Sequence, residues 1–330
     1  MKKPSSQLRQ DLVSGDWIVI APGRAARPHD FLKKQRPRKR TAKSSCPFED
    51  PQASGNGAPI LTYGSRTWEL QLINNKYPAF AHKDVCSGVM KSGPYAVCDT
   101  SGHHELLITR DHDKNFSQLS KNRARQVLEA FRDRYLMLTA DKCIEYISMF
   151  QNWGPTAGAS IAHPHYQFIA VPIVPPDVMH SLRGSLEYTK MHHQCVHCVM
   201  LDWEKKYKKR IIYENAGAIV YTPFVSKAAF EVRIFPKRHL PYFENTLDRD
   251  MDFVADALQV ALRRARKVLR DPDYNFFIHT APLKDKGRYG MYHWHIEIIP
   301  RFSLNAGFEL GTGIEINAVD PDMAAKLLRA

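Results

Sequence analysis

The segment AGASIAHPHYQFIAVP, residues 157–172, places two histidines one residue apart within an apolar run. This composition predicts a β-strand, in which residues i and i+2 lie on the same face. His163, His165 and Gln167 then share one face, while Pro164 lies on the other. Because proline interrupts strand pairing, we expect Pro164 at a sheet edge or a bulge. Polar side chains in a row are costly to bury without partners, so this face predicts a functional site.

The pattern of histidines around this segment, with one long stretch between them, occurs twice along the chain. In the first half 51 residues separate His112 from His163, and in the second half 54 residues separate His239 from His293. Each interval contains one long amphipathic stretch, and the second interval ends in the related motif HWHIE, residues 293–297. This self-similarity indicates an internal duplication. The two predicted units span residues 1–178 and 179–330.

The elements around these histidines define the expected fold class. Amphipathic, glycine-free stretches predict helices over residues 115–140 and 248–270. Apolar runs bounded by turn residues predict strands on either side of each helix. We therefore expect an α+β fold, a tandem duplication of a unit with a mostly antiparallel sheet and one main packing helix. The expected strands cover residues 11–22, 68–80, 103–112, 143–154, 160–172, 210–223, 228–241, 274–282 and 292–302.

Length and composition indicate a soluble protein. The 330 residues suit two domains, and 44% hydrophobic with 25% charged residues suits a sizeable core. No apolar run reaches the length of about 18 residues that a membrane span requires. The first residues, MKKPSSQLRQ, lack the apolar region of a secretion signal. We therefore expect a cytoplasmic protein.

The net charge of +13 is concentrated in part in KKQRPRKRTAK, residues 33–43, which holds seven basic and no acidic residues. Such a run predicts a solvated loop, because its charges repel one another. Nucleic-acid binding usually combines a basic patch with stacking aromatics, and this run has no aromatic residue, so we expect no nucleic-acid partner. A basic excess also suits a small anionic substrate such as a nucleotide sugar.

The six cysteines are too few and too irregularly spaced for a disulfide scaffold. Zinc takes four ligands from thiolate, imidazole and carboxylate groups, and two sets are predicted, which gives one or two zinc ions per chain. Because protein ligands would fill each set, both indicate structural sites. A redox pair is the alternative for the Cys-x-x-Cys, although its usual βαβ context is missing. The first set is Cys46, Glu49, His112 and His163; the second is Cys195, Cys198, His239 and His293.

If His163 faces a metal, His165 is left for chemistry. A neutral imidazole can attack an α-phosphorus and form a covalent nucleotidyl-imidazole. The attacking nitrogen is free when the other ring nitrogen donates to a fixed group, commonly a backbone carbonyl. Gln167, Ser160 and the backbone amides around Gly158 can donate to phosphoryl oxygens.

The motif GASIAHPHYQ, residues 158–167, resembles the active-site motif of galactose-1-phosphate uridylyltransferases, within the histidine-triad superfamily. Further blocks, among them NNKYPAF, FEVRIFPKRH and AGFELGTG, resemble that family in the same order along nearly the whole chain. The resemblance implies that His165 is the nucleophile of a ping-pong transfer. It also implies substrate-binding roles for Arg24, Arg27, Asn75, Asn152, Ser160 and Gln167, and, from the partner subunit of a homodimer, for Phe308 and Glu309.

Three departures from the family pattern bear on function. Glu49 replaces a cysteine of the first metal set, and Tyr166 adds bulk where glycine or serine is commoner. With Cys195 and Cys198 among its ligands, the second metal set resembles that of a divergent branch of the family, which includes ADP-glucose phosphorylases. In the second half, Glu297 stands where the first half has Gln167, and a carboxylate repels phosphate, so we interpret this copy as structural.

Two classes of function follow. The leading hypothesis is transfer of UMP from UDP-glucose to a hexose 1-phosphate such as galactose 1-phosphate, through nucleotidyl-His165. The same chemistry also allows adenylyl transfer, as in an ADP-sugar phosphorylase, or water as the acceptor. The alternative from another class is a zinc-stabilised nucleic-acid-binding protein, which predicts salt-dependent binding that survives loss of His165.

Overall fold

The computed structural model describes residues 5–24, 38, 41–83, 85–86, 88–302 and 306–330. Arg27 and most of the basic run lie outside the described residues. Within the described ranges, no helix is long and apolar enough to cross a membrane.

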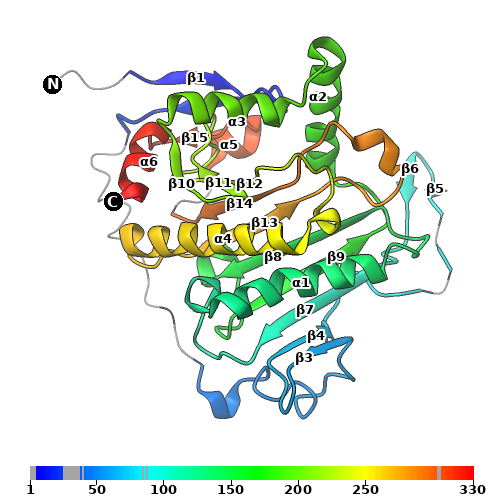
Figure 1. Cartoon of the computed structure of the whole chain (residues 1–330). Coiled ribbons are helices and arrows are strands. Elements are labelled where there is room, and N and C mark those ends of the chain that lie inside the picture. Colours follow the sequence, from blue (N-terminus) through cyan, green and yellow to red (C-terminus); the bar gives the residue numbers. More distant parts are fainter. Residues whose placement is uncertain (1–4, 25–37, 39–40, 84, 87, 303–305) are drawn as a thin grey trace.

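A ten-stranded antiparallel sheet forms the centre of the molecule (Figure 1). Its order is β3-β4-β7-β9-β8 followed by β13-β14-β12-β11-β10, so the second half repeats the first in reverse. This mirrored order confirms the duplicated α+β fold. The first five strands are β3 (Leu61–Tyr63), β4 (Leu70–Asn74), β7 (His103–Thr109), β8 (Tyr146–Trp153) and β9 (His165–Val171). The other five are β10 (Ile211–Glu214), β11 (Ala218–Tyr221), β12 (Val232–Pro236), β13 (Tyr274–His279) and β14 (His295–Pro300).

The two halves meet where β8 pairs with β13, with Phe150 opposite Phe277. A backbone ladder therefore crosses the boundary between the repeats. The sequence boundary at residues 178/179 lies within helix α2 (Pro176–His192). The division into two domains at that point stays a prediction.

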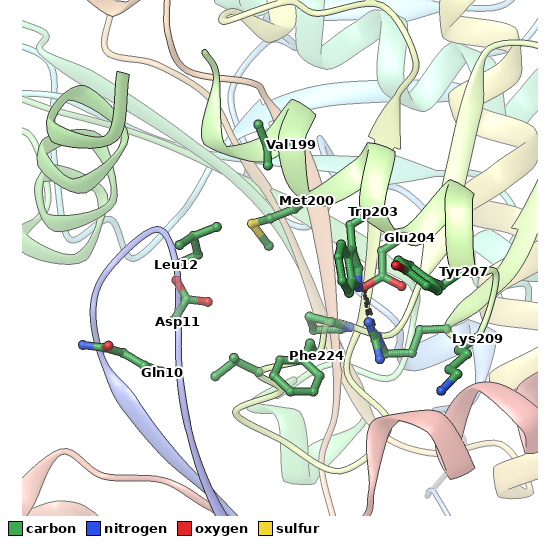
Figure 2. Close-up of a pocket in the computed structure, with 13 residues that line it drawn as sticks. Gln10, Asp11, Leu12, Val199, Met200, Trp203, Glu204, Tyr207, Lys209 and Phe224 are labelled. Carbon is green, nitrogen blue, oxygen red and sulfur yellow. Dashed lines mark hydrogen bonds and ion pairs between the residues drawn. The ribbon is translucent and has the colours of Figure 1, made fainter. Parts of the chain in front are cut away.

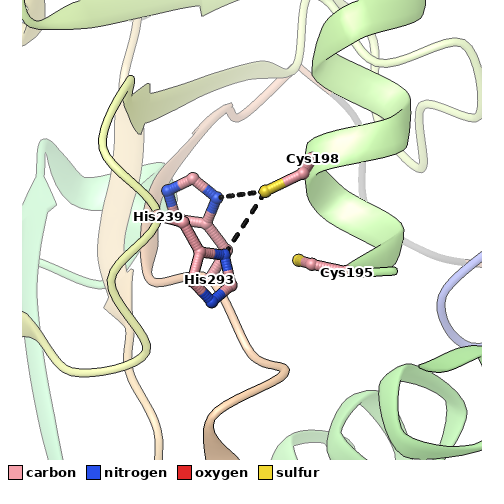
Figure 3. Close-up of side chains that lie close together, drawn as sticks. All are labelled: Cys195, Cys198, His239 and His293. Carbon is pink, nitrogen blue, oxygen red and sulfur yellow. Dashed lines mark hydrogen bonds between the residues drawn. The ribbon is translucent and has the colours of Figure 1, made fainter. Parts of the chain in front are cut away.

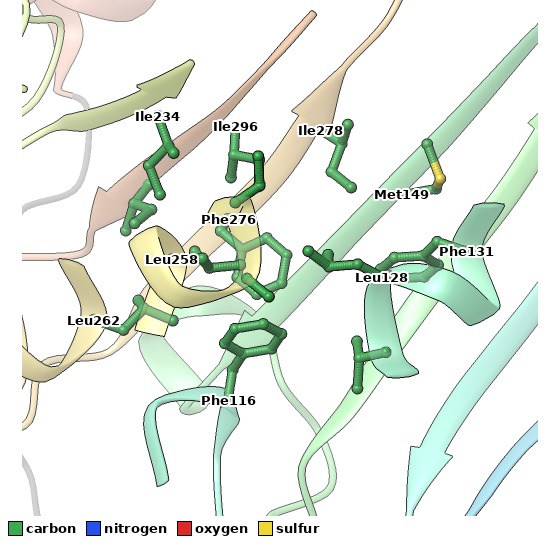
Figure 4. Packing of buried hydrophobic residues seen from close by; sticks show 14 of the residues in the cluster. Phe116, Leu128, Phe131, Met149, Ile234, Leu258, Leu262, Phe276, Ile278 and Ile296 are labelled. Atoms are coloured by element: carbon green, nitrogen blue, oxygen red, sulfur yellow. The ribbon is translucent and has the colours of Figure 1, made fainter. Parts of the chain in front are cut away.

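One long helix from each half covers the same face of the sheet, and the two lie side by side (Figure 1). These are α1 (Lys121–Met137) and α4 (Asp248–Leu269). The Ser120 hydroxyl caps α1 by accepting a hydrogen bond from the Arg123 amide. The apolar faces of both helices and the inner face of the sheet form one core, part of which Figure 4 shows. It includes Leu128, Phe131, Leu258, Leu262 and Phe276.

Within the strand expected over residues 11–22 only β2 (Trp17–Ile20) forms, and it pairs as a hairpin with an unexpected strand, β1 (Gln7–Gln10). The Asp11 carboxylate accepts hydrogen bonds from the amides of Val13 and Ser14, which turns the chain. The segment 210–223 likewise folds as a hairpin, β10 and β11. In both cases local side-chain hydrogen bonds outweigh the apolar pattern.

Several elements were not expected from the sequence. They include the helices α2, α3 (Val196–Tyr207), α5 (Gly307–Thr312) and α6 (Pro321–Arg329), and a small hairpin of β5 (Met90–Ser92) and β6 (Tyr95–Val97). β15 (Ile316–Asn317) pairs in parallel with β2. A disulfide joins Cys86 to Cys143. The short 3₁₀ turns are Lys43–Ser45, Phe116–Gln118, Pro155–Ala157, Phe243–Asn245 and Lys286–Tyr289.

Strand β9 begins at His165, so Pro164 precedes the strand and lies neither at an edge nor at a bulge. β9 is an internal strand between β7 and β8. Pro164 therefore removes no ladder hydrogen bond from it. Tyr166 is fully buried against Phe116 and Phe131 in the core. Its bulk consequently lies on the opposite face of the sheet from His165, because adjacent strand residues point to opposite faces.

Candidate active site

His165 occupies the first position of β9, opposite Ile108 of β7. Its Nδ1 lies 2.9 Å from the carbonyl oxygen of His163. Because a carbonyl only accepts hydrogen bonds, Nδ1 carries the proton and Nε2 keeps its lone pair. Burial lowers the pKa of His165, although the hydrogen bond to His163 opposes this effect. The ring is therefore neutral near pH 7, with one nitrogen available as a nucleophile.

Apolar side chains surround this imidazole. The ring of Phe48 meets the ring of His165 edge-on, with centroids 5.2 Å apart. Phe48 belongs to a small buried cluster with Cys46, Ile73, Leu106 and Ile108. The cluster desolvates the imidazole, which explains the lowered pKa.

Gln167 lies on the same face of β9, two residues beyond His165. Its Oε1 lies 3.1 Å from His104 Nε2. The amide nitrogen of Asn75 lies 3.0 Å from the same ring nitrogen of His104. Two predicted site residues, Gln167 and Asn75, are thus brought together around a histidine that the sequence analysis did not single out.

The loop between β8 and β9 is held by an aspartate from the second half. The Asp273 carboxylate accepts a hydrogen bond of 2.8 Å from the Thr156 amide. Gly154 has a φ of 86°, and a Cβ there would lie 1.9 Å from Asp273 Oδ1. This close approach requires glycine.

The predicted residues of this loop lie near one another. The amide nitrogen of Asn152 lies 3.6 Å from the position of a Cβ on Gly158, whose φ is 89°. The Asn152 carbonyl oxygen accepts a hydrogen bond of 2.8 Å from Asn275. Ser160 is exposed. The amides of Ala157, Gly158 and Ala159 donate within the loop to the carbonyls of Gly154 and Pro155. The expectation that the amides around Gly158 are free for a phosphoryl group is therefore wrong, and the side chains of Asn152 and Ser160 are the polar groups that the loop presents.

Three of the four residues of the first predicted metal set come together near His165, and Glu49 lies outside their cluster. Ligand atoms of Cys46, His112 and His163 all lie within 4.8 Å of one another. Glu49 Oε1 lies 2.6 Å from His112 Nδ1 and 3.7 Å from His163 Nδ1. The other ring nitrogens, His112 Nε2 and His163 Nε2, donate to the carbonyls of Thr41 and Thr109. This arrangement directs both Nδ1 atoms toward the cluster, where they could bind a metal. Burial raises the pKa of the Cys46 thiol.

The second set lies at the start of α3 (Figure 3). Cys198 Sγ lies 3.3 Å from His239 Nδ1 and 3.7 Å from His293 Nδ1. His239 Nε2 donates to the carbonyl of Gly290. The hydrogen bond from Cys198 lowers the pKa of the Cys195 thiol to about 5, which favours the thiolate. All four ligand atoms lie within 4.8 Å of one another, as a single metal site requires.

The second half repeats the histidine motif in a different environment. His295 Nδ1 lies 3.1 Å from the carbonyl of His293, as in the first half. However, its ring stacks on Phe235 and on His279, with centroids 4.4 and 4.7 Å away. Glu297 lies 3.5 Å from Arg233 and 3.4 Å from His279. The carboxylate is therefore engaged by the side chains of its own half.

The remaining predicted residues have other contacts. The exposed Arg24 donates from its backbone amide to Ala21, and Arg27 lies outside the described residues. The Phe308 side chain is half exposed on α5, where Glu309 accepts a hydrogen bond from the Ala306 amide. None of these contacts reaches His165, so the assigned roles of Arg24, Phe308 and Glu309 stay predictions.

Part of the basic run is packed against the site loop. Arg38 pairs with Asp271 at 2.7 Å and with Asp273 at 2.9 Å. Its guanidinium lies over the ring of Trp153, 4.5 Å from the centroid. The expectation of a solvated loop is therefore wrong for Arg38, because two carboxylates and an aromatic face replace its water. Spacing along the sequence gave no signal for this partnership, since Arg38 lies more than 100 residues from each of its partners.

A separate pocket of about 500 Å³ lies between the β1–β2 turn, α3 and the segment after β11 (Figure 2). Its wall includes Leu12, Met200, Trp203, Tyr207 and Phe224. None of the predicted site residues lines it. The pocket is thus distinct from the chemistry around His165.

Comparisons with known proteins agree with this fold and site. The sequence model of the galactose-1-phosphate uridyl transferase N-terminal domain matches residues 1–175, and a domain of unknown function, DUF4921, matches residues 95–329. The ADP-glucose phosphorylase of Arabidopsis thaliana is 32% identical, covering 100% of this chain and 94% of that protein. The galactose-1-phosphate uridylyltransferase of Thermotoga maritima is 24% identical, covering 98% of each.

Solved structures show the same likeness. The crystal structure of the A. thaliana ADP-glucose phosphorylase with bound ADP-glucose has a TM-score of 0.83 at 30% identity, covering 98% of this chain and 99% of that one. A uridylyltransferase structure has a TM-score of 0.76 at 25% identity, covering 98% of this chain and 97% of that one.

These enzymes match the duplicated α+β fold along the whole chain. The protein is therefore an enzyme of their type, a sugar-phosphate nucleotidyltransferase. The chain belongs to the galactose-1-phosphate uridyl transferase family.

Proposed function

We propose that the protein transfers an adenylyl group from ADP-glucose to inorganic phosphate through a covalent intermediate on His165. The observation that carries the mechanism is the hydrogen bond from His165 Nδ1 to the His163 carbonyl, which leaves Nε2 free. The choice of adenylyl and of phosphate is supported by the 32% identity to an ADP-glucose phosphorylase.

The reaction consists of two displacements. First, Nε2 of His165 attacks the α-phosphorus, the bond to the bridging oxygen breaks, and glucose 1-phosphate leaves with the bond's electron pair. Then a phosphate oxygen attacks the same phosphorus, the P–N bond breaks, and ADP leaves while His165 regains its lone pair. Gln167 and Ser160 hold the non-bridging oxygens, where charge develops.

The residues around the phosphates and the sugar complete this proposal. Arg24 and Arg27 bind the phosphates of the nucleotide sugar, as the family resemblance implies. Asn75 and Asn152 provide further polar contacts. Phe308 and Glu309 bind the hexose phosphate from the partner subunit of a homodimer, which operates in the cytoplasm.

Ligands of a tetrahedral zinc ion are about 3.3–3.8 Å apart, given zinc–ligand distances of about 2.0–2.3 Å. The distances from Cys198 to His239 and His293 are 3.3 and 3.7 Å, and Cys46 lies 3.5 Å from His163, so these residues fit zinc. Glu49 Oε1 lies only 2.6 Å from His112 Nδ1, so the first set fits through Cys46, His112 and His163. Zinc held by these residues would cross-link their segments and, in the first set, would fix His163, whose carbonyl accepts the hydrogen bond from His165.

The second half serves as a scaffold in this proposal. Phe235 and His279 cover both sides of the His295 ring, and Glu297 places a carboxylate where an incoming phosphate would lie. The half still contributes Asp273 and Asn275 to the loop of the first half.

A second candidate is uridylyl transfer from UDP-glucose to a hexose 1-phosphate such as galactose 1-phosphate. It is favoured by the match of residues 1–175 to the uridyl transferase domain and by the 24% identity along the chain to the T. maritima enzyme. The same nucleophile and loop serve both reactions.

The two candidates are separated by incubating the purified protein with ADP-glucose or UDP-glucose and measuring the mass of the intact chain. We expect an added AMP with ADP-glucose, which is lost on addition of phosphate with release of ADP. An added UMP that is removed by galactose 1-phosphate but not by phosphate identifies the second candidate. If neither donor gives an adduct on rapid quenching, the proposed function is wrong.

A further inference from the structure

We infer that His104 is a positioning residue for Gln167, fixing the side-chain amide so that its NH₂ group faces the transferred phosphoryl group. This inference rests on the proposed function and goes beyond it, because it assigns a role to a residue outside the metal and nucleophile motifs.

The protonation of His104 follows from its backbone contact. The amide of Ala79 donates to His104 Nδ1 across 3.1 Å. A backbone amide can only donate, so Nδ1 of the neutral ring holds a lone pair and Nε2 carries the proton. The tautomer of His104 is therefore the opposite of that of His165.

The proton on Nε2 then selects its acceptor. Two groups lie near it, Gln167 Oε1 at 3.1 Å and the amide nitrogen of Asn75 at 3.0 Å. The Asn75 carbonyl oxygen accepts from the amide of Tyr77, which turns its NH₂ group toward the histidine. A protonated nitrogen cannot accept from that group, so Gln167 Oε1 is the acceptor.

The orientation of Gln167 is set by this bond. The oxygen and nitrogen of an amide exchange places when the side chain flips, and only the nitrogen can donate to phosphate. With Oε1 held by His104, the NH₂ group is left to donate. Loss of the histidine proton donor would let the amide flip and present an oxygen to the phosphoryl group.

The internal duplication supports this interpretation. Leu106 is opposite Gln167 on β7, and Arg233 is opposite Glu297 on β12, so the second-half equivalent of His104 is Glu231. Glu231 accepts from Arg233 rather than donating to β14. The first half therefore combines a hydrogen-bond donor, His104, with Gln167. The second half combines an acceptor, Glu231, with Glu297.

The test is a double-mutant cycle on the rate of adduct formation with ADP-glucose or, if the second candidate holds, UDP-glucose. We expect His104→Phe to slow it about 10- to 100-fold and Gln167→Ala about 100- to 1000-fold. Because His104 acts through Gln167, the double variant should be no slower than Gln167→Ala. Losses that multiply would overturn the inference, since they indicate an independent structural role.

Two further measurements make the outcome specific. Two donors, each with sulfur in place of a different non-bridging α-oxygen, should form the adduct with the wild type at different rates. The ratio of these rates should fall equally in His104→Phe and Gln167→Ala. His104→Gln, which keeps an N–H donor, should recover part of the rate. His82→Phe, on an exposed neighbour that stacks on His103, is the matched control and should change neither readout.

Failure of the proposed function is distinguishable from failure of the inference. If wild-type protein forms no adduct with either donor, the function is wrong. The inference is then tested by the carbon resonance of the Gln167 side-chain carbonyl, which reports its hydrogen bond. That resonance should shift in His104→Phe and not in His82→Phe; an unchanged resonance in both would overturn the inference.

Discussion

Two histidines with the same local bond have different surroundings. In both halves the imidazole Nδ1 is tied to the carbonyl two residues earlier, at 2.9 Å for His165 and 3.1 Å for His295. His165 borders the loop that we propose binds phosphate, whereas the ring of His295 stacks on Phe235 and His279 and lines a pocket with Glu297. Both halves therefore prepare the same tautomer, and the neighbouring side chain, Gln167 in one half and the Glu297 carboxylate in the other, distinguishes them.

This difference predicts the effect of one substitution made in each half. We expect His165→Asn to abolish the covalent adduct, because the amide nitrogen of asparagine has no nucleophilic lone pair. His295→Asn should keep adduct formation within about threefold of wild type. Mass spectrometry after a rapid quench measures both. An adduct that persists in His165→Asn and disappears in His295→Asn would mean that the catalytic half has been misassigned.

At the scale of elements, the loop between β8 and β9 of the first half packs against a residue of the second half. Asp273 from the second half fills the space beside Gly154 and binds the Thr156 amide, while Arg38 holds Asp273 in turn. The geometry of the loop that we propose binds phosphate therefore depends on a segment that is remote in sequence.

Gly154→Ala tests this packing. The backbone there, at φ 86° and ψ 159°, is a region that only glycine commonly adopts. We expect a loss of about 2–4 kcal/mol in the free energy of unfolding, from backbone strain and the clash with Asp273. The matched control is Gly93→Ala, at φ 61° with no atom within 4 Å of a Cβ, which should cost about 1–2 kcal/mol. Equal losses in denaturant titrations would show that the contact with Asp273 contributes nothing.

Each proposed metal set likewise brings together residues from segments that are distant in the sequence. Cys198→Ser should reduce the zinc content, measured by elemental mass spectrometry, from two ions per chain to one and lower the melting temperature. Cys98→Ser, on a cysteine outside both clusters, is the control and should keep two ions. Retention of two ions by Cys198→Ser would contradict the proposed second zinc site.

The sequence predicted these elements where a periodic pattern or a paired motif existed. The two long helices follow from apolar periodicity, and the metal clusters follow from paired motifs that the duplication repeats. The expected strand at residues 11–22 contains a turn, and that at 210–223 is a hairpin, because the turn-forming hydrogen bonds of Asp11 and Asn215 are not visible in an apolar count. His104, Phe48 and Asp273 were missed because their contacts with Gln167, His165 and the loop between β8 and β9 join segments that are remote in sequence.

At the scale of the whole molecule, the mirrored strand order makes one sheet and one core from two repeats. Phe276 of β13 is fully buried and contacts the rings of Phe116 and Tyr166 from the first half, with centroids 5.9 and 6.1 Å away. The active half therefore relies on the second half for its buried face. The second half therefore contributes packing to the half that carries the proposed active site.

The shared core predicts that the halves unfold together. We expect wild-type protein to show a single calorimetric transition, and Phe276→Ala to lower the free energy of unfolding by about 3–5 kcal/mol while keeping it single. Phe277→Ala, on the neighbouring half-buried residue whose side chain lies on the opposite face of β13, is the matched control and should cost clearly less. Two separated transitions, with only one shifted by Phe276→Ala, would mean that the repeats are independent units despite their common sheet. A single transition follows because the ladder between β8 and β13 and the packing around Phe276 cannot be lost from one half alone.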